Sequence, residues 1–172
     1  PYAALNFAKL GAEVVKIEPL EGDPSRTHGP FPDGIEHKEK SALFLAYNHG
    51  KKSICLDLNA SQDREKLKSI LSHFDLVIEN QSLGFFDDRR LGYKKISYIN
   101  PSLIWVSILP FGEVGPYSKY VADDLVLFHM SGNAHGVIGP VENPNVEPPI
   151  RAGGYQAEMV AGITASTAAM VA

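Results

Sequence analysis

A single carboxylate, Glu158, stands at the start of a C-terminal segment that carries no other charge. The stretch RAGGYQAEMVAG, residues 151–162, has the pattern of a loop that runs into a helix, and Gly153 and Gly154 leave the backbone free to turn before it. The N–H groups at a helix N-terminus stabilise a carboxylate by about 0.3–1 kcal/mol. Two interpretations of Glu158 are therefore open: it complements the helix dipole, or it is a nucleophile or base.

A pair of acids, Asp123 and Asp124, precedes an apolar run in the stretch YVADDLVLFHMSG. Adjacent carboxylates repel each other, and their pKa values can separate. This would suit acid–base chemistry. The structural alternative is a helix N-terminus at which one of the two aspartates is the cap.

Two further segments have residues that suit ligand contact. Lys51 and Lys52 precede a predicted strand, where they either lie in a solvated turn or contact a phosphate. The Gly/Pro-rich stretch LPFGEVGPY, residues 109–117, follows another predicted strand. Its backbone either approaches a ligand closely or forms a plain turn.

Helical and strand patterns alternate along the chain and must position these residues. Helices are predicted at 2–10, 41–48, 61–74 and around 88–99, and strands at 12–18, 53–58, 75–80 and 103–109. The clearest helix has Leu67, Ile70, Leu71 and Phe74 on one face, with Ser61 as its expected cap. Short connections between alternating helices and strands predict an α/β fold with a parallel sheet covered by helices on both faces.

Ligands of such sheets bind at the carboxyl ends of the strands. Those ends fall at 18–19, 58–59, 79–81 and 109–112. No G-x-G-x-x-G and no G-x-x-x-x-G-K-[ST] follows any predicted strand, so a dinucleotide fingerprint or a P-loop has little support.

Composition excludes several other classes of protein. The net charge of −4 comes from interspersed acids and bases, so nucleic acid is not an expected partner. The C-terminal stretch is too short and polar to span a membrane, and the N-terminus has no signal-peptide pattern. The single cysteine, Cys55, is predicted to be a buried, inert thiol, and the lack of a possible disulfide favours a reducing, cytoplasmic location. The six histidines have no ligand spacing, so we predict no metal site.

Seven blocks, taken together and in order, resemble one family. They are LGAEVVKIEP, GDPSR, NHGKKSICLDL, DLVIEN, INPSLIWVSILPFGEVGPY, DDLVLFHMSG and AGGYQAEMVAGITA. The chain resembles the N-terminal part of a family III CoA-transferase (CaiB/BaiF family), a family that includes formyl-CoA and carnitine CoA-transferases and α-methylacyl-CoA racemases. The resemblance implies a Rossmann-like, CoA-binding large domain, of which residues 1–172 are the N-terminal part, with the first strand and the second domain absent. Both chain ends fall inside helical patterns, which agrees with a fragment.

The resemblance also implies a reaction. CoA moves from an acyl-CoA donor to a carboxylic acid acceptor through a carboxylate-bound intermediate, so coenzyme A enters as a thioester substrate and no cofactor is expected. The full-length enzyme would be an interlocked homodimer with no nucleic acid or membrane partner, and the fragment alone would be inactive. Aligned on A-[DE]-x-x-x-G, Glu158 stands where the transferases carry a nucleophilic aspartate, with Asp124 as nearby support. Backbone N–H groups near Gly153 and Gly154 would hold the oxyanion.

Two alternatives stay open. Racemases of the family pair an acid at the Glu158 position with a histidine, and Asp123 stands at the place of that histidine. The third possibility is a non-catalytic, CoA-binding half of a longer two-unit transferase.

Residues for coenzyme A follow from the same resemblance. Family contacts fall on the ends of two predicted strands: Leu56, Asp57, Leu58 and Asn59 after one, and Asn80, Gln81 and Ser82 after the next. A usual arginine aligns with Asp88, one step from Arg89, which is our candidate for the phosphate contact. Pro19 stands where some members carry an arginine that lies against the adenine.

Overall fold

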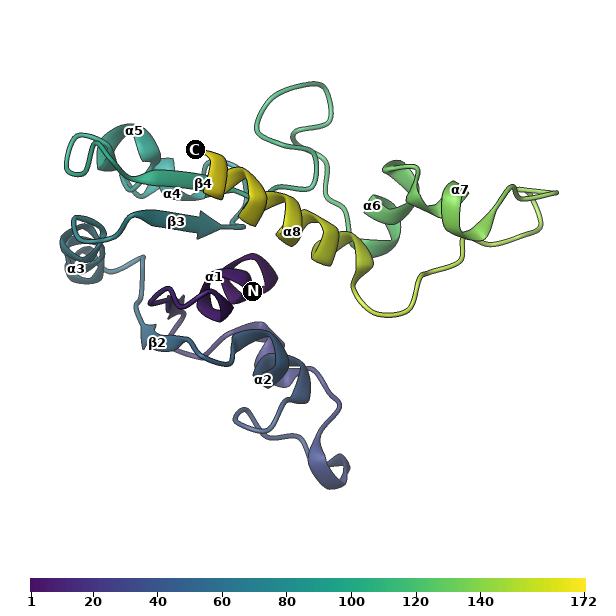
Figure 1. Ribbon diagram of the computed structural model, residues 1–172, viewed down its shortest axis with the longest axis horizontal. Coiled ribbons are helices and arrows are strands. Elements are labelled where there is room, and N and C mark those ends of the chain that lie inside the picture. The colour runs from purple at the N-terminus through teal and green to yellow at the C-terminus, as the bar shows by residue number, and fades with distance from the viewer.

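The computed structural model describes residues 1–172 as a mixed α/β fold with parallel strands (Figure 1). The strands are β1 (Val15–Glu18), β2 (Lys52–Cys55), β3 (Leu76–Glu79) and β4 (Ile104–Ser107). The helices are α1 (Tyr2–Lys9), α2 (Ala42–Asn48), α3 (Ser61–Leu71), α4 (Phe85–Asp88), α5 (Tyr93–Ile96), α6 (Asp124–Met130), α7 (Asn133–Ile138) and α8 (Gln156–Val171), with short 3₁₀ turns η1 (Pro24–Thr27) and η2 (Pro32–Gly34). The predicted alternation of helix and strand is confirmed, although each strand is only four residues long.

The parallel pairing is also confirmed, but the strands form two two-stranded sheets, β1–β2 and β3–β4, rather than one. The carbonyl groups of Val14 and Glu18 accept hydrogen bonds from residues of β2 and the segment directly after it. Backbone groups alternate in direction along a strand, so those of Val15 and Ile17 point to the opposite edge of β1, away from β2. The same alternation on β3 directs Leu76 and Ile78 away from β4. Each sheet therefore ends at a free edge, and no described strand joins them.

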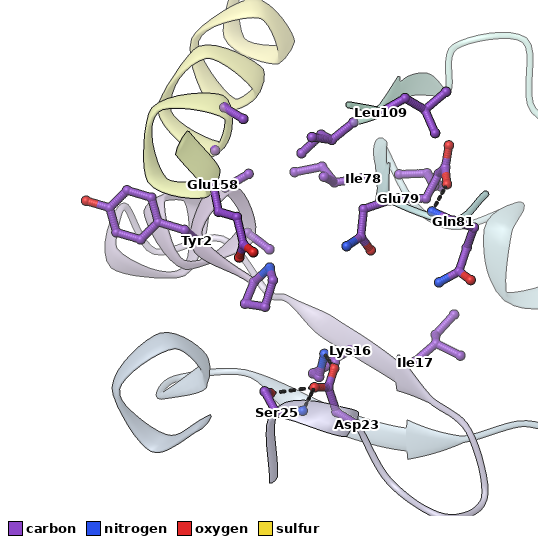
Figure 2. A pocket seen from close by; sticks show the side chains of 18 of the residues that line it. Tyr2, Lys16, Ile17, Asp23, Ser25, Ile78, Glu79, Gln81, Leu109 and Glu158 are labelled. Carbon is purple, nitrogen blue, oxygen red and sulfur yellow. Dashed lines mark hydrogen bonds and ion pairs between the residues drawn. The ribbon is translucent and has the colours of Figure 1, made fainter. Parts of the chain in front are cut away.

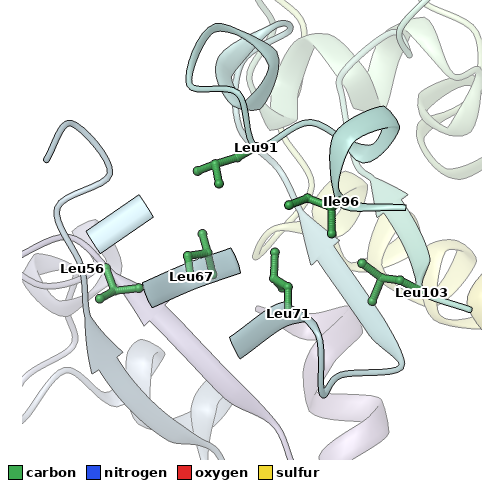
Figure 3. Close-up of a cluster of buried hydrophobic side chains, with 6 residues drawn as sticks. All are labelled: Leu56, Leu67, Leu71, Leu91, Ile96 and Leu103. Atoms are coloured by element: carbon green, nitrogen blue, oxygen red, sulfur yellow. The ribbon is translucent and has the colours of Figure 1, made fainter. Parts of the chain in front are cut away.

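The hydrophobic core lies around α3 (Figure 3). Leu67 and Leu71, one turn apart on α3, are among six buried side chains; the other four are Leu56, Leu91, Ile96 and Leu103. Val77 of β3 and Trp105 of β4 pack against this cluster. The apolar stripe predicted for residues 61–74 thus does face the core, although the helix itself ends at Leu71.

Three local predictions need correction. Ser61 does not cap α3: the N-cap position is Ala60, and no side chain caps it. The helix is held instead by Asp63, whose carboxylate accepts the N–H of Asp57 at 2.9 Å. The helical segment expected around 88–99 contains one short helix, α5, and only the last residue of α4, which begins earlier at Phe85. The two helices are broken where Gly92 lies so close to Asp87 that a Cβ would meet its carboxylate oxygen at 1.8 Å.

Cys55 is the third correction, because it is exposed rather than buried. β2 pairs with β1 on one edge only, and side chains alternate between the two faces of a strand. Ile54 is half-buried, and Cys55, next to it, faces outward.

No helix of the structure is both long and apolar enough to cross a membrane.

A buried ion pair closes the carboxyl end of β1. The Glu18 side chain is 1% exposed and accepts hydrogen bonds from Arg26 Nε at 2.7 Å and Nη2 at 3.0 Å. Ser53 Oγ at 2.6 Å and the N–H of Asp23 at 2.8 Å complete its partners. Burial alone would raise the pKa of Glu18, but these donors outweigh it and lower that pKa from 4.5 to about 2. The pair ties the GDPSR segment to β1.

Replacing Arg26 with alanine in the complete protein should lower the free energy of unfolding by about 3–5 kcal/mol, because Glu18 is left buried and unpaired. Since the folded pKa of Glu18 lies below its unfolded value, the paired carboxylate stabilises the fold above pH 4.5 and loses this effect as the pH falls through about 2. The difference in the free energy of unfolding between wild type and Arg26→Ala, measured with urea, should therefore become smaller as the pH falls from 4.5 to about 2. The control is Glu39→Gln: Glu39 is 71% exposed on the same arginine and should cost about 0–1 kcal/mol. Equal costs for the two variants would contradict the assignment.

Candidate functional site

A cleft of about 1570 Å³ lies between the two sheets and is walled by β1, β3, α1 and the start of α8. The carboxyl ends of all four strands line it, as expected for ligand binding in a parallel α/β fold. Figure 2 shows Glu158 reaching into the cleft from α8; the other labelled side chains around it include Lys16, Asp23, Ser25, Ile78, Gln81 and Leu109.

Most of the residues proposed for coenzyme A meet in this cleft. The lining includes Leu56, Asp57, Leu58, Asn59, Asn80, Gln81 and Arg89, together with Pro19. Ser82 and Asp88 are not part of it. Leu56 is 8% exposed, its side chain belongs to the core, and its N–H donates to the Glu18 carbonyl at 3.0 Å, so this residue has a structural role. Arg64 of α3 pins the loop after β2 by donating to the carbonyls of Leu58 at 3.1 Å and Asn59 at 2.6 Å.

Arg89 is held firmly at the cleft wall. Its guanidinium lies 3.8 Å from the centre of the Phe85 ring, and Nη2 donates to Asn59 Oδ1 at 3.0 Å. Nη1 donates to the Phe85 carbonyl at 3.1 Å, whereas Nε is buried without a partner. A fixed guanidinium that lines the cleft and has further N–H donors beyond these two hydrogen bonds suits an anionic group such as a phosphate.

Glu158 lies in the first turn of α8 and keeps an exposed surface in the open cleft. The cleft walls partly shield its carboxyl group from water, and the negative charge of Asp124 lies nearby. Both effects raise the pKa of Glu158, with the shielding as the larger cause. A carboxylate with a raised pKa is more basic than an ordinary glutamate.

The two adjacent aspartates have different partners. Asp123 caps its own helix, α6, by accepting the N–H of Val126 at 3.0 Å, which confirms the capping interpretation for this residue. Asp124 caps a different helix: its Oδ1 accepts the N–H groups of Ala157 at 2.9 Å and Glu158 at 3.4 Å, both in the first turn of α8. Neither aspartate lines the cleft. The racemase alternative therefore has no second acid–base group in contact with the cleft at position 123.

Other sequence candidates have structural partners. Gly153 and Gly154 do not line the cleft, and the Gly153 carbonyl accepts Gln156 Nε2 at 3.0 Å. Lys51 lines it, but its ammonium donates to Pro1 O, Tyr47 O and Asn48 Oδ1. Lys52 is exposed and pairs with Glu13 at 2.6 Å.

The pair Lys16–Asp23, on the cleft wall formed by β1 and η1, has no counterpart among the residues that the sequence predicts for the site. Asp23 accepts hydrogen bonds from Lys16 and from the N–H of Ser25. Burial opposes this, but the donors lower the pKa of Asp23 to about 2. The signal was present in GDPSR, because an aspartate directly before proline is typical of a helix cap. Nowhere in the structure do three His, Cys, Asp or Glu side chains group as metal ligands.

α8 packs closely against α1, and this contact fixes the position of Glu158, which lies at the start of α8. Gly162, one turn after Glu158, faces α1, where a Cβ would lie 3.1 Å from both the backbone nitrogen of Ala3 and the Cβ of Tyr2. Asn6 of α1 also donates to Ser166 Oγ at 3.0 Å.

Gly162→Val should therefore lower the free energy of unfolding of the complete protein by about 1–3 kcal/mol, because the new methyl groups push α8 off α1. The matched control is Gly136→Val in α7, where a Cβ would meet nothing within 4 Å. That change should stay within about 0.5 kcal/mol. Urea unfolding measures the free energy change of both variants. Similar changes at the two glycines would argue against close packing of α8 on α1.

Comparisons with known proteins point the same way as the geometry. The family model described as CoA-transferase family III matches residues 1–172. The succinyl-CoA:glutarate CoA-transferase of Homo sapiens is 35% identical over 171 residues, which are 99% of this chain and 37% of that protein. The succinyl-CoA:(R)-benzylsuccinate CoA-transferase subunit BbsE of Thauera aromatica is 36% identical over 132 residues, which are 77% of this chain and 32% of that protein. The crystal structure of a CAIB/BAIF family protein from Brucella suis matches with a TM-score of 0.85 at 33% identity, over 99% of this chain and 44% of the other. The chain thus spans less than half the length of these relatives.

Proposed function

The chain belongs to CoA-transferase family III, and from this we propose that it is the coenzyme A-binding part of an enzyme that moves CoA from an acyl-CoA to a carboxylic acid. The observation that carries the proposal is the position of Glu158. Its carboxyl group reaches into the cleft that the strand ends and Arg89 line. The human relative is named for succinyl-CoA and glutarate, so these are the donor and acceptor to test first.

The proposed chemistry uses Glu158 as a nucleophile. A carboxylate oxygen of Glu158 attacks the thioester carbonyl, the C–S bond breaks, and CoA leaves as a thiolate, which gives an acyl–glutamyl anhydride. The thiolate then attacks the glutamyl carbonyl and releases the donor acid, which leaves a glutamyl–CoA thioester. The acceptor carboxylate attacks the glutamyl carbonyl of this thioester, the C–S bond breaks, and CoA leaves again as a thiolate, which gives an acceptor–glutamyl anhydride. The thiolate then attacks the acceptor carbonyl of this anhydride, which forms the acceptor acyl-CoA and releases the Glu158 carboxylate.

Incubation of the complete enzyme with succinyl-CoA, followed by hydroxylamine, should convert Glu158 to a hydroxamate that mass spectrometry locates on the peptide. Glu158→Gln should give no adduct and lose turnover, since an amide is not a nucleophile of this kind. Glu158→Asp keeps the carboxylate but draws it back by one methylene, and a misplacement on the order of 1 Å costs about 10²-fold in rate.

A different outcome would separate the competing possibilities. Full turnover by Glu158→Gln would reject the covalent role and favour a non-catalytic CoA-binding half. Exchange of the α-proton of an acyl-CoA in deuterated water, with no acceptor acid present, would favour a racemase.

The proposal includes the architecture of the domain. We assign residues 1–172 to the N-terminal part of a Rossmann-like large domain in which one more parallel strand lies between β1 and β3. Support comes from the free edges: the N–H groups of Val15, Ile17, Leu76 and Ile78, here called the slot amides, face away from the paired strands, and both edges line the cleft. Unpaired backbone groups along a strand edge can pair with another strand, and one inserted strand would satisfy both edges.

In the complete protein, the slot amides should be as strongly protected from hydrogen exchange as the amides of Lys52 and Ile104, which are paired here. NMR-detected exchange measures each amide separately. Fast exchange at the slot amides alone, with Lys52 and Ile104 protected, would show that no strand fills this position.

The complete chain is also proposed to form an interlocked homodimer. The exposed apolar side chains of α8, Val160 at 50%, Ile163 at 49% and Met170 at 65%, support a further protein surface against this helix.

A further inference from the structure

We propose that Asp124 is a positioning residue for the reaction proposed above: its Oδ1 aims the first turn of α8, and its negative charge keeps the Glu158 carboxylate nucleophilic. This inference rests on the proposed role of Glu158 as nucleophile. It concerns how a group behind the cleft wall controls that nucleophile, since Asp124 itself does not line the cleft.

The aiming role follows from the hydrogen bonds of α8. The first N–H groups of a helix have no partner inside it, and Tyr155 at the N-cap position supplies no side-chain acceptor. Asp124, at a distance of 33 residues along the chain, accepts the N–H of Ala157 at 2.9 Å, and it also accepts that of Glu158 itself at 3.4 Å. Its own helix does not need this carboxylate, because Asp123 already caps α6. Asp124 is therefore free to bind the backbone of the residue that carries the nucleophile.

The charge role follows from the burial of Asp124. The residue is 5% exposed, and its second oxygen, Oδ2, is buried with no hydrogen-bond partner. A negative charge in this position disfavours a second negative charge on Glu158, and it contributes to the raised pKa of that group. Arg151 and His28 act in the opposite direction and lower the pKa of Glu158, but they do not outweigh the raising effects.

The two roles can be separated with two substitutions at one position. Asp124→Asn keeps an oxygen acceptor for the two N–H groups but removes the charge. Asp124→Ala removes both. Asp123→Asn is the matched control, because it neutralises the neighbouring carboxylate, which is exposed and binds only its own helix.

The test is the pH profile of kcat/KM for the complete enzyme with succinyl-CoA and glutarate. Below its pKa, Glu158 is protonated and inactive, so the acid limb of the profile reports its titration in the free enzyme. Asp124→Asn should move this limb to lower pH by roughly half a unit or more, because the like charge is gone. Asp124→Ala should show the same shift and a further loss of kcat of about 10²-fold, because the turn is no longer aimed. Asp123→Asn should leave the limb in place.

Several outcomes would overturn the inference. An unchanged acid limb in Asp124→Asn rejects the charge role, and an undiminished kcat in Asp124→Ala rejects the aiming role. Titration of Glu158 by NMR in the same variants gives the charge result even where turnover is lost. Failure of the proposed function would look different: the wild-type enzyme would form no hydroxamate on Glu158, while the NMR shift caused by Asp124→Asn would persist.

Discussion

The carboxylate of Asp124 at the start of α8 is the contact on which the arrangement of the cleft depends. α8 follows a loop with two glycines and has no capping side chain of its own, so its direction is not set locally. Asp124 satisfies its first N–H groups and joins α6 to α8. One turn later, Gly162 allows α8 to lie directly on α1. These two contacts together determine where Glu158 lies relative to the strand ends.

The carboxylates around the cleft are held in opposite electrostatic environments. Glu18 and Asp23 receive hydrogen bonds from Arg26, Lys16 and backbone donors, and their pKa values fall to about 2. Glu158 has no such donor in the structure; it has a like charge nearby and walls that shield it from water, and its pKa rises. The first environment makes a carboxylate structural, because both of its oxygens already accept hydrogen bonds. The second leaves a carboxylate basic and accessible, which is what a nucleophile requires.

The break between the two sheets has a simple cause in hydrogen bonding. A parallel strand pairs through alternate residues, so each strand presents one set of backbone groups to each side. On both β1 and β3, the backbone groups of one edge have no partner strand among residues 1–172. These two unpaired edges form part of the cleft wall. The cleft therefore combines two spaces: the region at the strand ends, where Arg89 and Asn59 lie and where we propose that coenzyme A binds, and the space between the unpaired edges of β1 and β3.

Local patterns in the sequence were enough for most of the elements, because periodicity and capping act over a few residues. The stripe of Leu67 and Leu71, the cap at Asp123 and the parallel pairing of short apolar strands were all predictable in this way. Contacts between distant residues were not. No local signal shows that Asp124 binds a helix that starts 32 residues later. Nor does one show that Cys55 is exposed on β2, or that Asp63 rather than Ser61 anchors α3. The sequence by itself determined which residues could carry charge and which segments form strands. Only the tertiary structure decided which carboxylates receive hydrogen-bond donors and which one, Glu158, has a raised pKa, because that depends on groups brought together from separate parts of the chain.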